Sequence, residues 1–185
     1  MTTVLAFLPG LLGLAVAVTL GSRLLVLLFP ARREQEARFR AIADELGGRF
    51  GRSLFVADPE LRLSLHGQPV FVTCTFAKHG YEHTRVRLDA LQGCALPGLY
   101  LDLEPGAAVD EPRLGDDGRA AAAELAQLVG HACKIEILQK LWGELGFAEL
   151  ISGGFLTDRD GGRTLARAIS LMQRIAMGLV PELEA

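Results

Sequence analysis

Apolar residues concentrate at the start of the chain, where Arg23 is the only charged side chain between residues 4 and 29. A transmembrane helix needs about 20 predominantly apolar residues. At about 1.5 Å per residue, a helix over residues 4–29 would measure roughly 39 Å, which is longer than a hydrocarbon core of roughly 30 Å. Arg23 can therefore lie near one membrane face, with its side chain among the headgroups. The pattern predicts a transmembrane anchor over residues 1–30.

A cleaved signal peptide and a buried core helix are the two alternatives for this segment. A signal peptide would begin with basic residues and have a shorter apolar stretch, whereas this chain begins with MTTV and has no Lys or Arg before Arg23. The membrane span is therefore preferred over both. Within it, Gly10 and Gly13 would allow another membrane helix to approach closely, although their spacing is not that of a GxxxG motif.

Basic residues follow the apolar run and predict its orientation. The flanking residues are Arg23, Arg32, Arg33, Arg38 and Arg40, and only the terminal amine lies on the other side. The positive-inside rule then places the following domain in the cytoplasm and the N-terminus outside, in a bacterial-type inner membrane. The same arginines would be close enough to contact anionic headgroups, and a solvated helix face explains them equally well.

The pattern changes after Pro30. Residues 31–48 have the apolar spacing of an amphipathic helix leaving the membrane, and Gly47-Gly48 would end that helix. From residue 54 to residue 104, apolar and polar residues alternate, and short glycine-containing turns separate the alternating segments. This pattern is typical of an antiparallel β-meander.

The C-terminal half predicts two helices and a hairpin. Residues 120–145 favour a helix by propensity, although Gly130 would divide it. Residues 148–162 suggest a hairpin with its turn at Gly153-Gly154. Residues 163–180 predict an amphipathic helix. Its apolar face consists of Leu165, Ile169, Met172, Ile175, Ala176 and Leu179.

Together these elements predict the α+β fold class, with an N-terminal transmembrane helix followed by an antiparallel β-meander sheet packed by amphipathic helices. The predicted organisation has three parts. They are a transmembrane anchor at residues 1–30, a juxtamembrane helix at residues 31–48 and a cytoplasmic α+β domain at residues 49–185.

Charge and cysteine content narrow the function classes. The chain has 22 Asp and Glu, and all of them lie after residue 30. Of its 19 Lys and Arg, 18 lie there too, since Arg23 is the one exception, so that part has a net charge of −4. A nucleic-acid-binding domain would call for a basic surface. The three cysteines, Cys74, Cys94 and Cys133, are odd in number and widely spaced. They favour a reducing compartment over a disulfide-stapled secreted domain.

Histidines and cysteines are the first residues to consider for a metal site. His79 and His83 flank a predicted turn, Cys74 lies upstream, and His131 precedes Cys133 by two positions. A zinc site needs about four ligands, often in tight pairs, and helix positions two apart point about 200° from each other. We therefore interpret these residues as loop histidines and buried cysteines. The sequence predicts no metal and no cofactor.

Residues 104–119 are rich in Pro, Gly and Asp, which predicts a surface loop. Carboxylates cluster in and beside it, at Asp102, Glu104, Asp110, Glu111, Asp116 and Asp117. Such a cluster can bind a hard cation, but no EF-hand pattern is present, and loops collect Asp for their turn geometry. The sequence also contains no nucleotide-binding loop, GxSxG elbow or kinase signature. No catalytic residue is predicted.

These observations favour a protein that acts by binding, as an accessory, scaffold or regulatory subunit of a larger membrane complex. Its expected partners are the lipid bilayer, other integral membrane proteins and possible further copies of the chain, and Trp142 and Phe147 are candidate partner contacts. The main alternative is a membrane-tethered enzyme or small-molecule sensor with a pocket between the sheet and the C-terminal helices. The acidic loop and His66, His79 and His83 would act there. A lipid-sensing domain, based on the juxtamembrane arginines, is a third hypothesis.

Overall fold

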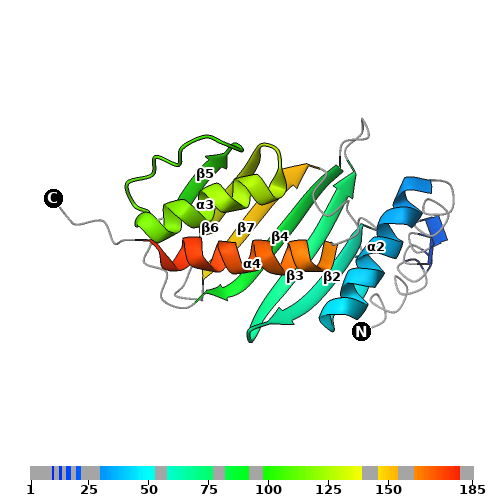
Figure 1. Cartoon of the computed structure of the whole chain (residues 1–185). Coiled ribbons are helices and arrows are strands. Elements are labelled where there is room, and N and C mark those ends of the chain that lie inside the picture. Colours follow the sequence, from blue (N-terminus) through cyan, green and yellow to red (C-terminus); the bar gives the residue numbers. More distant parts are fainter. Residues whose placement is uncertain are drawn as a thin grey trace.

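The computed structural model describes residues 30–52, 58–76, 82–91, 98–138, 146–153 and 161–179, together with positions 10, 13, 16, 17, 20 and 21. Within these ranges, one seven-stranded antiparallel sheet has three helices on one of its faces (Figure 1). The strand order is β1-β2-β3-β4-β7-β6-β5. The α+β class and the antiparallel sheet predicted from the sequence are confirmed.

The helices lie side by side over the sheet, with α3 and α4 across its middle and the β5 side, and α2 over the β1–β2 edge (Figure 1). The helices are α2 (Pro30–Leu46), α3 (Asp116–Val129) and α4 (Gly161–Met177). The strands are β1 (Arg49–Arg52), β2 (Pro59–Leu65), β3 (Gln68–Phe76), β4 (Glu82–Leu91), β5 (Leu99–Leu103), β6 (Cys133–Leu138) and β7 (Gly146–Gly153).

Alternation along the strands produces one buried face and one open face. In β5, for example, the three leucines are buried and Tyr100 and Asp102 are exposed, because successive strand side chains point to opposite sides. The buried side chains meet the apolar face of α4. The predicted helix at residues 163–180 is confirmed in α4, where Leu165, Ile169, Met172, Ile175 and Ala176 are all buried.

The helix predicted at residues 31–48 is observed as α2, which ends at Leu46. Gly47 follows with a φ of +68°, a left-handed conformation that favours glycine and ends many helices. Helix α2 packs against β1, β2 and α4, and its Phe39 is 1% exposed. This helix is therefore packed into the same hydrophobic core as the sheet.

The predicted meander is correct for β2, β3 and β4, which pair in chain order. It is wrong for β5, because β7 and β6 lie between β4 and β5 in the sheet. The strands that separate them come later in the chain, so the local pattern of residues 54–104 contains no signal for this arrangement. Strand β1 is a further strand that the sequence pattern did not predict.

The helix predicted at residues 120–145 is wrong over residues 130–138, and residues 139–145 lie outside the described residues. Helix α3 ends at Val129, and Gly130, with a φ of +78°, donates its N–H to the Ala126 carbonyl. Residues 133–138 form β6, in which Cys133, Ile135 and Ile137 are buried and Lys134 is exposed. The period-two pattern of this short segment therefore prevailed over the helix propensity of the longer run.

The hairpin predicted at residues 148–162 is also wrong. Residues 146–153 form a single strand, β7, whose two neighbours are β4 and β6. Gly161 and Gly162, at the end of the predicted hairpin, are the first residues of α4. The turn signal at Gly153 marks the end of a central strand and not a return to a neighbouring one.

Most of the predicted membrane span, including Arg23, lies outside the described residues. Gly10 and Gly13 are helical and exposed, and a Cβ added at either would meet no atom within 4 Å. Among the residues that the structure describes, no helix is both long and apolar enough to cross a membrane. The predicted N-terminal transmembrane helix is therefore not supported by the residues that the structure describes.

Candidate functional site on the open face of the sheet

The face of the sheet opposite the helices is formed by side chains that alternate with the core residues. None of the described helices packs on this face, and its side chains are exposed or half-buried. They include the aromatic residues Phe71, Tyr100 and Phe147, and Tyr100 is 62% exposed. We refer to this surface, defined by the outward-facing residues of β1–β7, as the open face.

A continuous row of side chains crosses the open face from β2 to β6. Strand register places Arg62 opposite Phe71, Phe71 opposite Arg87, Arg87 opposite Glu149, and Glu149 opposite Glu136. A parallel row two residues along the strands runs Glu60, Thr73, Arg85, Ile151 and Lys134. Residues directly opposite each other on one face are close neighbours, so each row is a line of neighbouring side chains.

Arginines stack on aromatic rings of the open face. The guanidinium carbon of Arg87 lies 4.2 Å from the centre of the Phe147 ring, and that of Arg62 lies 5.9 Å from the centre of the Phe71 ring. Arg87 also donates from Nε to Asp89 Oδ1 at 2.7 Å. These cation–π contacts hold charged and aromatic groups together at the surface. Phe147, a predicted partner contact, therefore lies on the open face, while Trp142 lies outside the described residues.

Charge is divided unequally across the open face. The β1–β4 side has four arginines, Arg49, Arg62, Arg85 and Arg87, against the carboxylates Glu60 and Asp89. The β7–β6–β5 side has three carboxylates, Glu149, Glu136 and Asp102, against Lys134. Like charges are direct register partners on both sides, Arg49 with Arg62 and Glu136 with Glu149. Such pairs are destabilising within one sheet, and neighbouring opposite charges offset them only in part, because Arg62 lies 2.5 Å from Glu60 and Glu149 lies 3.8 Å from Arg85.

A groove with a volume of about 410 Å³ lies at one end of β4, β5, β6 and β7. It brings together His83, Asp102 and Glu104, which the sequence suggested as candidate ligand-binding residues. The groove is lined by His83, Asp102, Leu103, Glu104, Ala132, Cys133, Lys134, Ile151, Ser152 and Gly153. This pocket is formed at the strand ends, whereas the sequence suggested one between the sheet and the C-terminal helices. His66 lies in the exposed β2–β3 turn, and His79 lies outside the described residues.

Polar groups in the groove are paired with each other. The Lys134 amine is 3.3 Å from Asp102 Oδ1, and His131 Nε2 is 2.8 Å from Ser152 Oγ. The Ser152 hydroxyl also lies 3.3 Å from the Gly153 carbonyl, to which it can donate. These contacts connect the start of β6 to the end of β7 at the groove.

Cys133 is 4% exposed at the inner wall of the groove, and burial raises the pKa of its thiol to about 11. At pH 8 such a thiol would be ionised in roughly one molecule in a thousand. In a Cys94→Ser variant we therefore expect the native thiols of Cys74 and Cys133 to react slowly with Ellman's reagent, and both to react fast in urea. A fast native phase that disappears on adding Cys133→Ser would show instead that the groove exposes this thiol.

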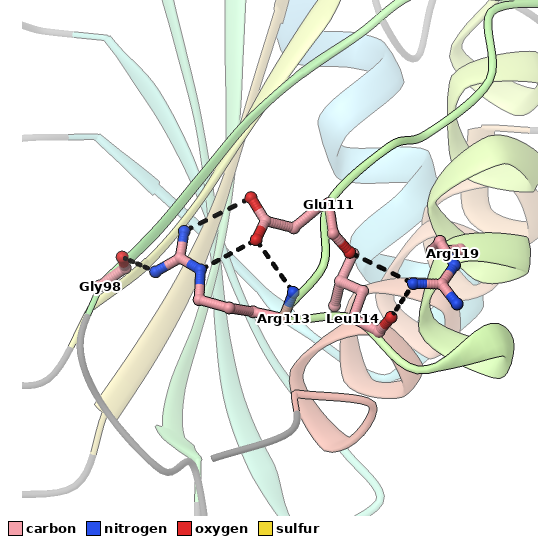
Figure 2. Close-up of polar contacts among 5 residues, drawn as sticks. All are labelled: Gly98, Glu111, Arg113, Leu114 and Arg119. Carbon is pink, nitrogen blue, oxygen red and sulfur yellow. Dashed lines mark hydrogen bonds and ion pairs between the residues drawn. The ribbon is translucent and has the colours of Figure 1, made fainter. Parts of the chain in front are cut away.

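The acidic loop is held by two arginines (Figure 2). Arg113 donates from Nε to Glu111 Oε1 at 2.9 Å and from Nη1 to the Gly98 carbonyl at 3.2 Å. Arg119, in the first turn of α3, donates to the backbone carbonyls of Glu111 and Leu114. The loop is thereby attached to the start of β5 and to α3, and the Glu111 carboxylate has a structural role.

The hydrogen bond from Arg113, assisted by its charge, lowers the pKa of Glu111. A lowered folded-state pKa stabilises the fold above the unfolded value near 4.5, and the stabilisation is lost as pH falls through the folded value. We expect Glu111→Gln to lower the free energy of unfolding by about 1 kcal/mol at pH 7, with the difference disappearing near pH 2. Urea unfolding at both pH values measures it, and an unchanged difference at low pH would contradict this assignment.

Two further carboxylates of the predicted cluster, Asp116 and Asp117, form ion pairs with arginines. Asp116 lies 2.6 Å from Arg119, and Asp117 lies 2.5 Å from Arg174 of α4. The Asp117 contact lowers the pKa of that carboxyl. No group of three or more His, Cys, Asp or Glu in the described ranges is placed to hold a metal ion.

The juxtamembrane arginines make local contacts on α2. Arg38 lies 2.7 Å from Glu34, one helical turn away, and the guanidinium of Arg40 lies 4.9 Å from the centre of the Phe50 ring. Arg33 is exposed, and for Arg32 only the backbone is described. Arg38 and Arg40 therefore have contacts within the domain, and their contact with lipid headgroups stays a prediction.

The chain matches no protein-family model, no curated protein and no solved structure with which it was compared.

Proposed function

We propose that this chain is a single-span membrane-anchored binding protein, an accessory, scaffold or regulatory subunit of a membrane complex, and that it binds its protein partner through the open face. The main support is the open face itself, where half-buried aromatics and stacked arginines lie on a seven-stranded sheet. Aromatic residues and arginine are enriched at protein interfaces. The like-charge register partners are a second support, since opposite charges from a partner would relieve them.

The membrane anchor is proposed from the sequence of residues 4–29, a long apolar run followed by basic residues. A charge in the middle of a membrane helix opposes its insertion by several kcal/mol. We therefore expect the full chain to stay in the membrane pellet after alkaline carbonate extraction, and a Leu14→Arg variant to be extracted. Equal extraction of both proteins would end the anchor proposal.

Partner binding is tested by co-purification of the C-terminally tagged full chain in a mild detergent, followed by mass spectrometry. Arg87→Glu changes a stacked arginine at the centre of the open face, and Arg163→Glu is the matched control, because Arg163 is exposed on α4 on the opposite side of the sheet. We expect a stoichiometric companion that is retained by the control and lost with Arg87→Glu. A companion that both variants retain would place binding elsewhere.

A second candidate function is the binding of a small polar molecule in the groove. Its support is specific: His83, Asp102 and Lys134 line the same volume of about 410 Å³, which falls within the range of ligand pockets. A ligand that binds only the native state raises its melting temperature. A metabolite that does so for the parent chain, but not for Lys134→Met, would favour this candidate over the first.

A further inference from the structure

We propose that the partner bound by the open face is a second copy of this chain, packed face to face about a two-fold axis that runs parallel to the strands along β4. This inference rests on the proposed function of the open face as a binding surface. A two-fold interface places the same surface on both copies, so the face must complement itself. The observation that favours this occupant is the division of charge between its two halves.

The strand order fixes which strands would meet. Strand β4 is the central strand of the seven, so rotation about it places β2 over β6, and β3 over β7, of the other copy. Rotation about an axis parallel to the strands keeps each residue at its own level along them. Arg62 and Glu136 occupy one row, and Glu60 and Lys134 occupy the next. Each of these four charges would therefore face an opposite charge of the second copy.

Arg62 and Lys134 each have one ion-pair partner in their own chain, Glu60 at 2.5 Å and Asp102 at 3.3 Å, but both remain largely exposed to solvent on the open face. The side chains of Arg62 and Lys134 are both 65% exposed. Sheets that pack face to face lie about 10 Å apart with their strands rotated by about 30°, a distance that pairs of long charged side chains can bridge. The Glu136–Glu149 repulsion within each copy would also be reduced by the approach of Arg62.

On the axis itself, each copy would present Arg85 and Arg87 to their own equivalents. Within one chain these arginines already have partners, because Arg85 lies 3.8 Å from Glu149 and Arg87 lies 2.7 Å from Asp89. Their charges are therefore compensated before the copies meet. The half-buried Phe71 and Ile151 lie beside the axis on β3 and β7, where face-to-face packing would remove them from water.

The dimensions of the face suit a modest interface. Seven strands at about 4.8 Å spacing span roughly 29 Å. The five residues of β5, a length that every strand except the four-residue β1 reaches, add roughly 17 Å in the other direction. The projected area is roughly 500 Å² per copy, below the roughly 800 Å² of a standard interface. We therefore expect a reversible dimer, which confinement of both copies to one membrane would favour.

The test is a charge swap, measured by light scattering and analytical ultracentrifugation on the full chain in detergent. Arg62→Glu and Glu136→Arg should each weaken dimerisation by about tenfold or more, because like charges then meet twice per dimer. An equimolar mixture of the two variants should form the mixed dimer, and the double variant should dimerise again. Arg163→Glu should dimerise like the parent, and melting temperatures confirm that every variant is folded.

Several results would overturn the inference. A parent chain that is monomeric at tens of micromolar would overturn it. Single variants that dimerise like the parent would also overturn it, because the copies would then be held together through their anchors. Failure of the mixture to pair would exclude this axis. If the chain is monomeric but retains an unlike protein in an Arg62-dependent manner, the proposed function stands and this inference fails. If no open-face substitution changes any association, both fail.

Discussion

Replacing Phe39 with alanine is expected to lower the free energy of unfolding by about 3–5 kcal/mol, the cost of a large core truncation. Phe39 is 1% exposed and belongs to the hydrophobic core, although it lies on the helix that directly follows the predicted anchor. Urea unfolding of the full chain, followed by circular dichroism, measures the loss. The matched control is Asp44→Ala on an exposed position of α2, for which we expect a change within about 0.5 kcal/mol.

Comparable small losses for Phe39→Ala and Asp44→Ala would contradict this expectation and would mean that α2 is a loosely attached linker.

The expected result has a functional consequence. Helix α2 begins at Pro30 and packs against β1, β2 and α4. If residues 4–29 span the membrane as proposed, this packing holds the domain next to the bilayer, because no long linker separates the anchor from the core.

Local patterns predicted the elements whose signals are contained within one segment. The apolar face of α4 and the end of α2 at Gly47 are examples, since helix periodicity and a left-handed glycine act within a few residues. Strand β6 is not predicted, because its six residues with period two follow directly on an alanine-rich segment that favours a helix. The alternation of Ile135 and Ile137 with charged residues was the available signal.

The open face could be predicted only in part. Alternation in β2, β3 and β4 indicates that these strands have one polar side, and the residue type of Phe147 alone makes it a candidate partner contact. The division of charge could not be foreseen, because it depends on β7 and β6 lying between β4 and β5. That order is set by pairing between segments far apart in sequence, which period and propensity do not encode.

The second large effect is expected at the contact between the ends of α3 and α4. Gly118 is buried in α3 and Gly178 directly follows α4, and the Gly178 carbonyl accepts a hydrogen bond from the Gly115 N–H at 2.9 Å. A Cβ added to Gly178 would lie 2.8 Å from Gly118 Cα and 3.0 Å from Gly118 N. These are backbone atoms, so the added carbon cannot be accommodated by a side-chain rotation, and one helix end would have to move.

We therefore expect Gly178→Val to lower the free energy of unfolding by about 3 kcal/mol, at the upper end of overpacking effects. Gly51→Val is the matched control on β1, because a Cβ there meets its nearest neighbour at 3.9 Å and valine favours strands. The control should be neutral or slightly stabilising in the same urea titration. Equal stability of the two variants would show that the α3 and α4 ends separate at little cost. Arg174 and Asp117 form an ion pair across the same contact. If the helix ends separate easily, this ion pair contributes nothing to the fold, and Arg174→Met should leave the free energy of unfolding unchanged. The stability of Arg174→Met is therefore a second measurement of whether these helix ends are held together.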